Sequence, residues 1–239
     1  MKTKHILVLF LVAAIIVAGF FLVAYSRVWG KAELEFKIHI NEQLVLESVY
    51  GESPTFAIWL EEPSTGKVKT VFVTNRAGQN DWEGKVSVPA LPLWTKINTL
   101  ESEQQVFKNT FFHDVDAISG ATPTPGYFTV RNKVKPDSIK LFCWIEMNLA
   151  GDYNEFYKEF DEETKISDEY AIGQPALVYK ATIYPKTGNV FIPEIVGMSG
   201  TDPVKMIQPV QGITTAKDIF DEIIISIVRP KPKIINNAK

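Results

Sequence analysis

Seven consecutive residues, 116–122, combine the residue types needed to hold a covalently attached phosphate group. They read Asp-Ala-Ile-Ser-Gly-Ala-Thr. The hydroxyl of Thr122 can be the group to which a phosphate is attached, and Ser119 can donate a hydrogen bond to phosphate oxygens. Gly120 and Ala121 keep bulk away, so that an enzyme or a phosphate can approach the backbone closely. Turns that contain glycine also present backbone N–H groups to anions.

In its spacing, D-x-x-[ST]-G-A-T, this segment resembles the signature at which flavin transferases attach FMN to a threonine through a phosphoester. The resemblance implies covalent FMN on Thr122, positioned by Asp116, Ser119, Gly120 and Ala121. The nearby aromatic residues could stack on the isoalloxazine ring; they are Phe111, Phe112, Tyr127 and Phe128. A second interpretation stays open, because Asp, Ser, Gly and Thr also build tight turns. Pro123 and Pro125 would make such a connection rigid without any cofactor.

A wider resemblance covers roughly residues 34–184. The segments that carry it are residues 56–61, 68–74, 82, 89–94, 116–126 and 173–179. In this order they are similar to a bacterial family of predicted periplasmic proteins that is classed as a domain of unknown function. Members occur near PepSY-type membrane proteins and flavin-transfer systems. The resemblance implies a β-rich periplasmic fold and a link to redox work outside the cytoplasm.

An apolar segment near the N-terminus predicts a membrane anchor. Residues 6–25 contain no charge, and 20 helical residues span about 30 Å, the thickness of the bilayer core. Lys2 and Lys4 precede the segment, which places this end in the cytoplasm and the rest outside. A cleaved signal peptide is the alternative, although its apolar core is usually shorter. The expected organisation is a cytoplasmic end (1–5), a transmembrane signal anchor (6–25), a stalk (26–33), an extracytoplasmic domain (34–229) and a basic tail (230–239).

Charge and cysteine content exclude several classes of protein. The formal net charge is −3, and all 28 acidic residues follow the apolar segment, which argues against binding to nucleic acid. The single cysteine, Cys143, lies in an apolar run and is expected to be buried. The sequence contains no Cys/His pattern for zinc or haem. Asp114 and Asp116, with His113 beside them, could bind a cation, but a solvated acidic loop is the favoured interpretation.

Short segments with alternating apolar residues predict a mainly β fold. Residues 34–40 alternate strictly, and residues 55–60 and 67–74 are joined by a turn-rich loop, as in a β-hairpin. Further strands are expected over 127–133, 139–147, 176–184 and 223–228, with short helices over 99–108 and 214–222. This pattern is typical of an antiparallel β-sandwich, immunoglobulin-like or related.

These observations lead to two functional hypotheses. In the first, the chain is a membrane-anchored accessory or electron-transfer protein that carries FMN on Thr122 and works with a flavin transferase and PepSY-type or other redox membrane proteins. In the second, it is a cofactor-free binding or assembly module at the membrane surface. No nucleophile–base pair supports a hydrolase, so a redox carrier is favoured over that class.

Overall fold

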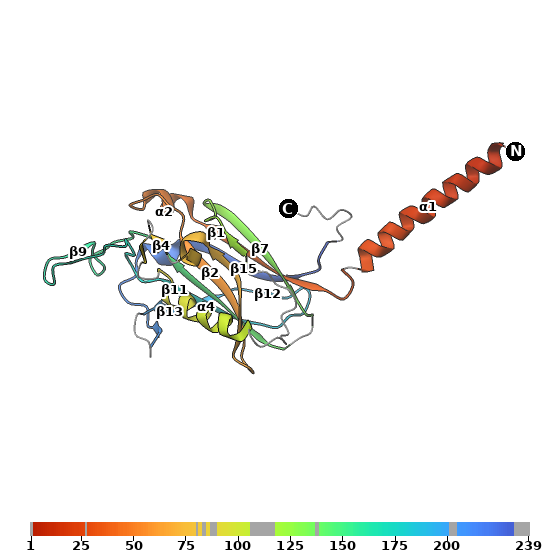
Figure 1. Ribbon diagram of the computed structural model, residues 1–239. Helices are drawn as coiled ribbons and strands as arrows, with labels where there is room; N and C mark the ends of the chain where they lie inside the picture. The colour runs from red at the N-terminus through yellow and green to blue at the C-terminus, as the bar shows by residue number, and fades with distance from the viewer. Residues whose placement is uncertain are drawn as a thin grey trace.

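The computed structural model describes residues 2–26, 28–79, 81–82, 85–86, 90–105, 118–136, 139–200 and 205–231. The described part is mainly β and forms two large sheets. Helix α1 (Lys2–Ser26) projects from one end of this body (Figure 1). No helix among the described residues is both long and apolar enough to cross a membrane. In α1 the described side chains are those of His5 and residues 11–26.

The smaller sheet has four antiparallel strands. Their order is β12 (Val190–Phe191), β15 (Phe220–Val228), β1 (Ala32–Ile40) and β7 (Gly126–Val134). Along β1, buried and half-buried residues alternate at every position. The alternation expected for residues 34–40 is thereby confirmed, because successive side chains of a strand point to opposite faces of the sheet.

The larger sheet has seven strands. Their order is β14 (Ile207–Gln208), β13 (Glu194–Ser199), β11 (Leu177–Ile183), β8 (Leu141–Asn148), β2 (Thr55–Glu62), β3 (Lys67–Thr74) and β6 (Ile118–Gly120). All neighbours are antiparallel except β3 and β6, which are parallel. The expected hairpin between residues 55–60 and 67–74 is confirmed as β2 and β3.

The two sheets pack face to face around one apolar core, which is the arrangement of a β-sandwich. Phe56 of β2 is fully buried at its centre and meets Phe220 of β15 edge to face, with 5.3 Å between ring centroids. Burying a large side chain of this kind contributes about 1.5–3 kcal/mol. The predicted mainly β, antiparallel fold is therefore confirmed at this level.

Helix α4 (Pro92–Gln105) builds a second core on the outer face of the larger sheet. Trp94 and Leu93 of the helix pack there against Trp59 of β2. The sequence prediction placed a helix over residues 99–108, so it put the start of the helix too late. Pro92 occupies the first helical position, where proline is favoured because its missing N–H would have no partner.

The smaller elements lie at the ends of the sandwich or extend the sheets. They are α2 (Glu42–Glu47), α3 (Asn75–Gln79), β4 (Asp81–Trp82), β5 (Lys85–Val86), β9 (Phe160–Asp161), β10 (Ile166–Ser167) and the 3-10 helix η1 (Thr215–Asp218). The pairing of β1 with β7 and β15 brings Ala32, Val134 and Val228 together at the end from which α1 emerges, here called the α1 end. The opposite end carries residues 152–169, here called the arm, which include β9 and β10 and extend away from the body (Figure 1).

Candidate functional site

The Gly-Ala-Thr segment lies at the arm end of the sandwich, in a link between the two sheets. Strand β6 is the edge of the larger sheet, with Ser119 opposite Val73 and Gly120 opposite Thr74 of β3. Residues 121–125 then lead to Gly126, which begins β7 in the smaller sheet. Gly126 has a φ of +100°, and a Cβ atom there would meet nothing within 4 Å. The glycine is therefore required by backbone conformation rather than by lack of space.

Of the five predicted site residues, two have described side chains. Ala121 is exposed and Thr122 is half-buried. For Ser119 and Gly120 the structure describes the strand pairing of the backbone. Asp116 lies outside the described residues, as do His113 and Asp114. The segment forms a connection between two strands, and Thr122 in it is partly exposed to solvent. This geometry suits an acceptor hydroxyl and also suits a purely structural link.

The two described aromatic residues that follow the segment point in opposite directions. Phe128 packs into the core, with its ring centroid 4.7 Å from that of Phe72 and 5.5 Å from that of Phe56. Tyr127 is 62% exposed and lies on the outer face of the smaller sheet. Phe111 and Phe112 are outside the described residues. Among the described aromatic candidates, Tyr127 is therefore the one whose ring is open to a ligand.

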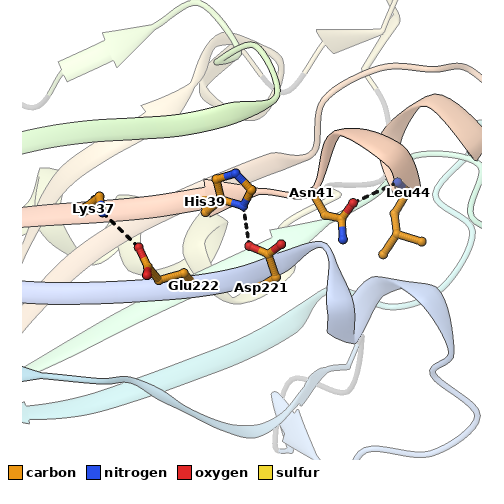
Figure 2. Close-up of polar contacts among 6 residues, drawn as sticks. All are labelled: Lys37, His39, Asn41, Leu44, Asp221 and Glu222. Carbon is orange, nitrogen blue, oxygen red and sulfur yellow. Dashed lines mark hydrogen bonds and ion pairs between the residues drawn. The ribbon is translucent and has the colours of Figure 1, made fainter.

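Tyr127 belongs to a polar cluster that sequence reasoning did not identify. The Nδ1 atom of His39 lies 2.6 Å from Oδ1 of Asp221, and Lys37 donates to Glu222 over 3.1 Å (Figure 2). The rings of His39 and Tyr127 are 4.5 Å apart. The Lys37 ammonium lies 4.0 Å from the Tyr127 ring centroid, a cation–π geometry. The hydrogen bond to Glu222 is the main cause that raises the pKa of Lys37.

The contact between His39 and Asp221 joins neighbouring strands β1 and β15 on the outer face of the smaller sheet. An ionised carboxylate only accepts hydrogen bonds, so Nδ1 of His39 is the donor where Asp221 is ionised. The alternation of polar and apolar residues over 34–40 indicated that His39 lies on the polar face of a strand. Its partner Asp221 could not be recognised, because it lies 182 residues away in the chain.

Asn41 fixes the chain next to this cluster. Its side-chain oxygen accepts the Leu44 backbone N–H over 3.2 Å and caps α2 (Figure 2). Its own backbone N–H donates to the Ile219 carbonyl over 2.9 Å, which holds the end of β1 against the start of β15. Capping satisfies a backbone donor that a helix start would otherwise leave unpaired. Asn41 thus helps to position His39 and Asp221, each two residues from one of these two contacts.

A buried carboxylate lies on the other side of the larger sheet. Glu146 of the central strand β8 is fully buried and accepts the backbone N–H groups of Leu93 (3.1 Å) and Trp94 (2.6 Å) at the start of α4. Burial raises its pKa to about 7, although hydrogen bonds from Ser199, Trp94 and Leu93 act to lower it. Its position under α4 makes it a structural carboxylate that orients the helix rather than a group open to ligands.

The remaining sequence candidates are part of the cores. Cys143 is fully buried, and burial raises the pKa of its thiol, so the expectation of a core cysteine is confirmed. Trp59 is buried and stacks on the half-buried Trp144, with 6.3 Å between ring centroids. Trp94 of α4 packs against the larger sheet. Within the part of the chain that the structure describes, no group of three or more His, Cys, Asp or Glu side chains could hold a metal ion.

Comparison of the chain with protein-family models, curated proteins and solved structures gave no significant match. The arguments for function therefore rest on the geometry of the chain itself. Two features of that geometry stand out. One is the partly exposed Thr122 in the link between the sheets, and the other is the opposite placement of α1 and the arm (Figure 1).

Proposed function

We propose that the chain is a membrane-anchored, extracytoplasmic accessory protein that carries FMN on Thr122 and passes electrons between partner proteins. The observation that carries this proposal is the partial exposure of Thr122 within a D-x-x-[ST]-G-A-T segment, in a link that begins directly after an edge strand. A transferase must reach the acceptor hydroxyl, and an edge strand followed by an exposed residue leaves that approach open on at least one side.

The residues around Thr122 have separate roles in this proposal. Thr122 would carry FMN through its hydroxyl, and the motif implies that Asp116 and Ser119 would position the group, with the Ser119 hydroxyl as a donor to phosphate oxygens. Tyr127 offers an exposed ring for stacking. His39 packs against that ring and contacts Asp221, so the ring lies in polar surroundings. FMN, when bound, supplies the redox chemistry, and the protein contributes position and surroundings.

The anchor in this proposal is α1. Residues 6–25 carry no charge, and the apolar side chains of residues 11–23 are largely exposed, as a lipid-facing helix requires. Tyr25, the last residue of the segment, and Trp29, just beyond it, are exposed and suit the membrane interface, where such residues are enriched. With Lys2 and Lys4 in the cytoplasm, the sandwich lies outside. In the alternative, the same segment is a signal peptide that is removed after export.

The position of Thr122 has a consequence for its partners. The nine residues of β1 separate the α1 end from the arm end, and nine strand residues span about 30 Å. Thr122 is therefore about 30 Å from the α1 end, where the anchor joins the sandwich. A partner that exchanges electrons with it would meet the protein well above the membrane surface. PepSY-type or other redox membrane proteins with large extracytoplasmic parts fit this requirement.

In-gel flavin fluorescence tests the proposal. The full chain would be produced together with a flavin transferase, denatured and separated by mass. We expect a fluorescent band for the wild type and for Thr124→Val, a control in the same link, and no fluorescence for Thr122→Val. A wild-type band that stays dark while a known flavinylated protein in the same cells fluoresces would refute the flavin proposal.

The arm favours a second candidate, a cofactor-free binding or assembly module. It carries eight Asp or Glu and two Lys within residues 152–169, and it exposes Phe156, Phe160 and Ile166. Apolar side chains surrounded by charge at the tip of a projecting segment are typical of a docking surface. Cross-linking of Ile166→Ser in membranes would test this function. In this candidate the substitution loses cross-linked partners, whereas Thr122→Val retains them.

A further inference from the structure

The α1 end differs sharply in charge from the rest of the domain. Five described stretches meet there through the strand pairings, residues 31–33, 61–67, 133–136 with 139–140, 184–189 and 228–231. Together these described residues contain eight Lys or Arg and three Asp or Glu, whereas the arm at the opposite end contains two and eight. The domain is therefore basic at the α1 end and acidic in the arm.

The acidic residues at the α1 end are partly engaged within the protein. Glu62 is buried and accepts a hydrogen bond from Ser64, and Glu61 accepts the Trp144 indole N–H over 2.7 Å. Lys186 and Arg229 are exposed, and neither belongs to an ion pair among the described residues. The surface potential of this end is thus dominated by its cations.

Exposed apolar side chains lie among these cations. Tyr184 is 56% exposed and Ile139 is 41% exposed, and both flank strands that end here. Trp29 is 79% exposed in the connection from α1. Basic residues interspersed with aromatic and aliphatic ones are the composition that binds the interface of an anionic bilayer, where the aromatic rings insert at headgroup level.

The connection to α1 is short. Helix α1 ends at Ser26 and β1 begins at Ala32. Even when fully extended, that connection spans only about 20 Å. If α1 crosses a membrane, the α1 end of the sandwich cannot leave the neighbourhood of the headgroups, and its cations can come within the ~8–10 Å over which charges act at physiological salt.

We propose that the α1 end of the sandwich lies on anionic phospholipid headgroups, so that the domain stands on the membrane with its arm and Thr122 pointing outward. This inference rests on the proposal that α1 is a membrane anchor. The same lipid charge repels the acidic arm, which adds to the preference for this orientation. Each Lys or Arg at an anionic surface strengthens contact about fivefold.

Lipid quenching of a site-specific fluorophore tests the orientation. The purified full chain would be reconstituted, with no other protein, into bilayers of phosphatidylcholine or of phosphatidylcholine with roughly one third phosphatidylglycerol. Each bilayer would contain lipid that is spin-labelled at the headgroup. One variant carries the label at Thr187→Cys in the 184–189 turn, and the other at Glu162→Cys in the arm. We expect strong quenching of the fluorophore at position 187 in the anionic bilayer, and weaker quenching there in the neutral bilayer or at high salt. We expect no quenching at position 162.

Removing cations provides the matched comparison. Lys186→Gln combined with Arg229→Gln and Lys231→Gln should weaken the contact by up to about a hundredfold, at about fivefold for each residue. Lys158→Gln with Lys217→Gln, at the arm end, should leave quenching at position 187 unchanged. Quenching at position 187 that is absent, or equal in neutral and anionic bilayers, would overturn the inference.

Alkaline extraction separates this result from a failure of the anchor. A chain that resists extraction from the bilayer but shows no charge-dependent quenching contradicts only the orientation. A chain that is extracted contradicts the anchor, and with it both proposals.

Discussion

Replacing Glu146 by Gln should remove a pH dependence from the stability of the domain. Glu146 is fully buried beneath the start of α4, where burial raises its pKa from an ordinary 4.5 to about 7. A raised acid pKa means that the folded protein holds the proton more tightly than the unfolded chain does. Between those two pH values the unfolded chain loses the proton first, so the free energy of unfolding falls as pH rises.

The expected magnitude follows from the two pKa values. The difference between 4.5 and about 7, at about 1.4 kcal/mol for each pKa unit, amounts to roughly 3 kcal/mol. The wild type should lose this much more stability than Glu146→Gln between about pH 4.5 and about pH 7, with little further difference above that range. Gln keeps the shape of the protonated acid and one acceptor for the N–H groups of Leu93 and Trp94.

Urea unfolding of the full chain in detergent micelles, followed by tryptophan fluorescence at a series of pH values, measures this difference. Trp94 of α4 and Trp59 of β2 are buried in the core between the helix and the sheet, so their fluorescence reports detachment of the helix. Glu103→Gln, on the exposed side of α4, should keep the wild-type pH dependence. A constant difference between wild type and Glu146→Gln across the range would refute the reasoning. A wild type that gains on the variant as pH rises would show instead that the helix start stabilises an ionised Glu146.

Substitutions at three further positions, followed by urea unfolding or calorimetry, test the core, a helix cap and a close backbone contact. Asn132 is buried with no partner for either amide atom among the described residues, so Asn132→Leu should raise the free energy of unfolding by about 1–2 kcal/mol; a loss of stability would contradict this. Asn41→Ala removes the cap of α2 and should cost about 1 kcal/mol, whereas Asn41→Ser should restore most of it. Gly173 has a φ of +67°, and a Cβ there would lie 2.6 Å from the Asp152 backbone nitrogen. Gly173→Ala should therefore lower the thermal midpoint in calorimetry, and an unchanged midpoint would refute the contact.

Strands with local signals could be predicted from the sequence. The alternation in residues 34–40 and the turn-rich loop after residue 60 depend on neighbours in the chain, so β1 and the β2–β3 hairpin were recognised. The start of α4 was missed because the helix was expected only from residue 99, whereas Pro92 is its first residue. Strand β6 was missed because three residues are too few to show a period.

Contacts between distant residues were beyond sequence reasoning. Glu146 is 52 residues from Trp94 in the chain. The sequence near either residue does not indicate that the Glu146 carboxyl accepts a backbone N–H at the start of the helix that contains Trp94. The His39–Asp221 pair depends on the register of β1 against β15. In contrast, the Gly-Ala-Thr segment was visible because its chemistry is local, although its position at the arm end required the topology. Helix α1 includes the predicted residues 6–25, and its crossing of a membrane stays a prediction.

The intact mass of the chain tests the central claim most directly. The full chain would be purified from membranes of cells that also produce a flavin transferase, and then denatured to remove any free flavin. The account predicts a mass increase equal to one FMN less one water, located by fragmentation at Thr122 and lost in Thr122→Val but not in Thr124→Val. An unmodified mass at full transferase activity, or a flavin located at any other residue, would contradict it.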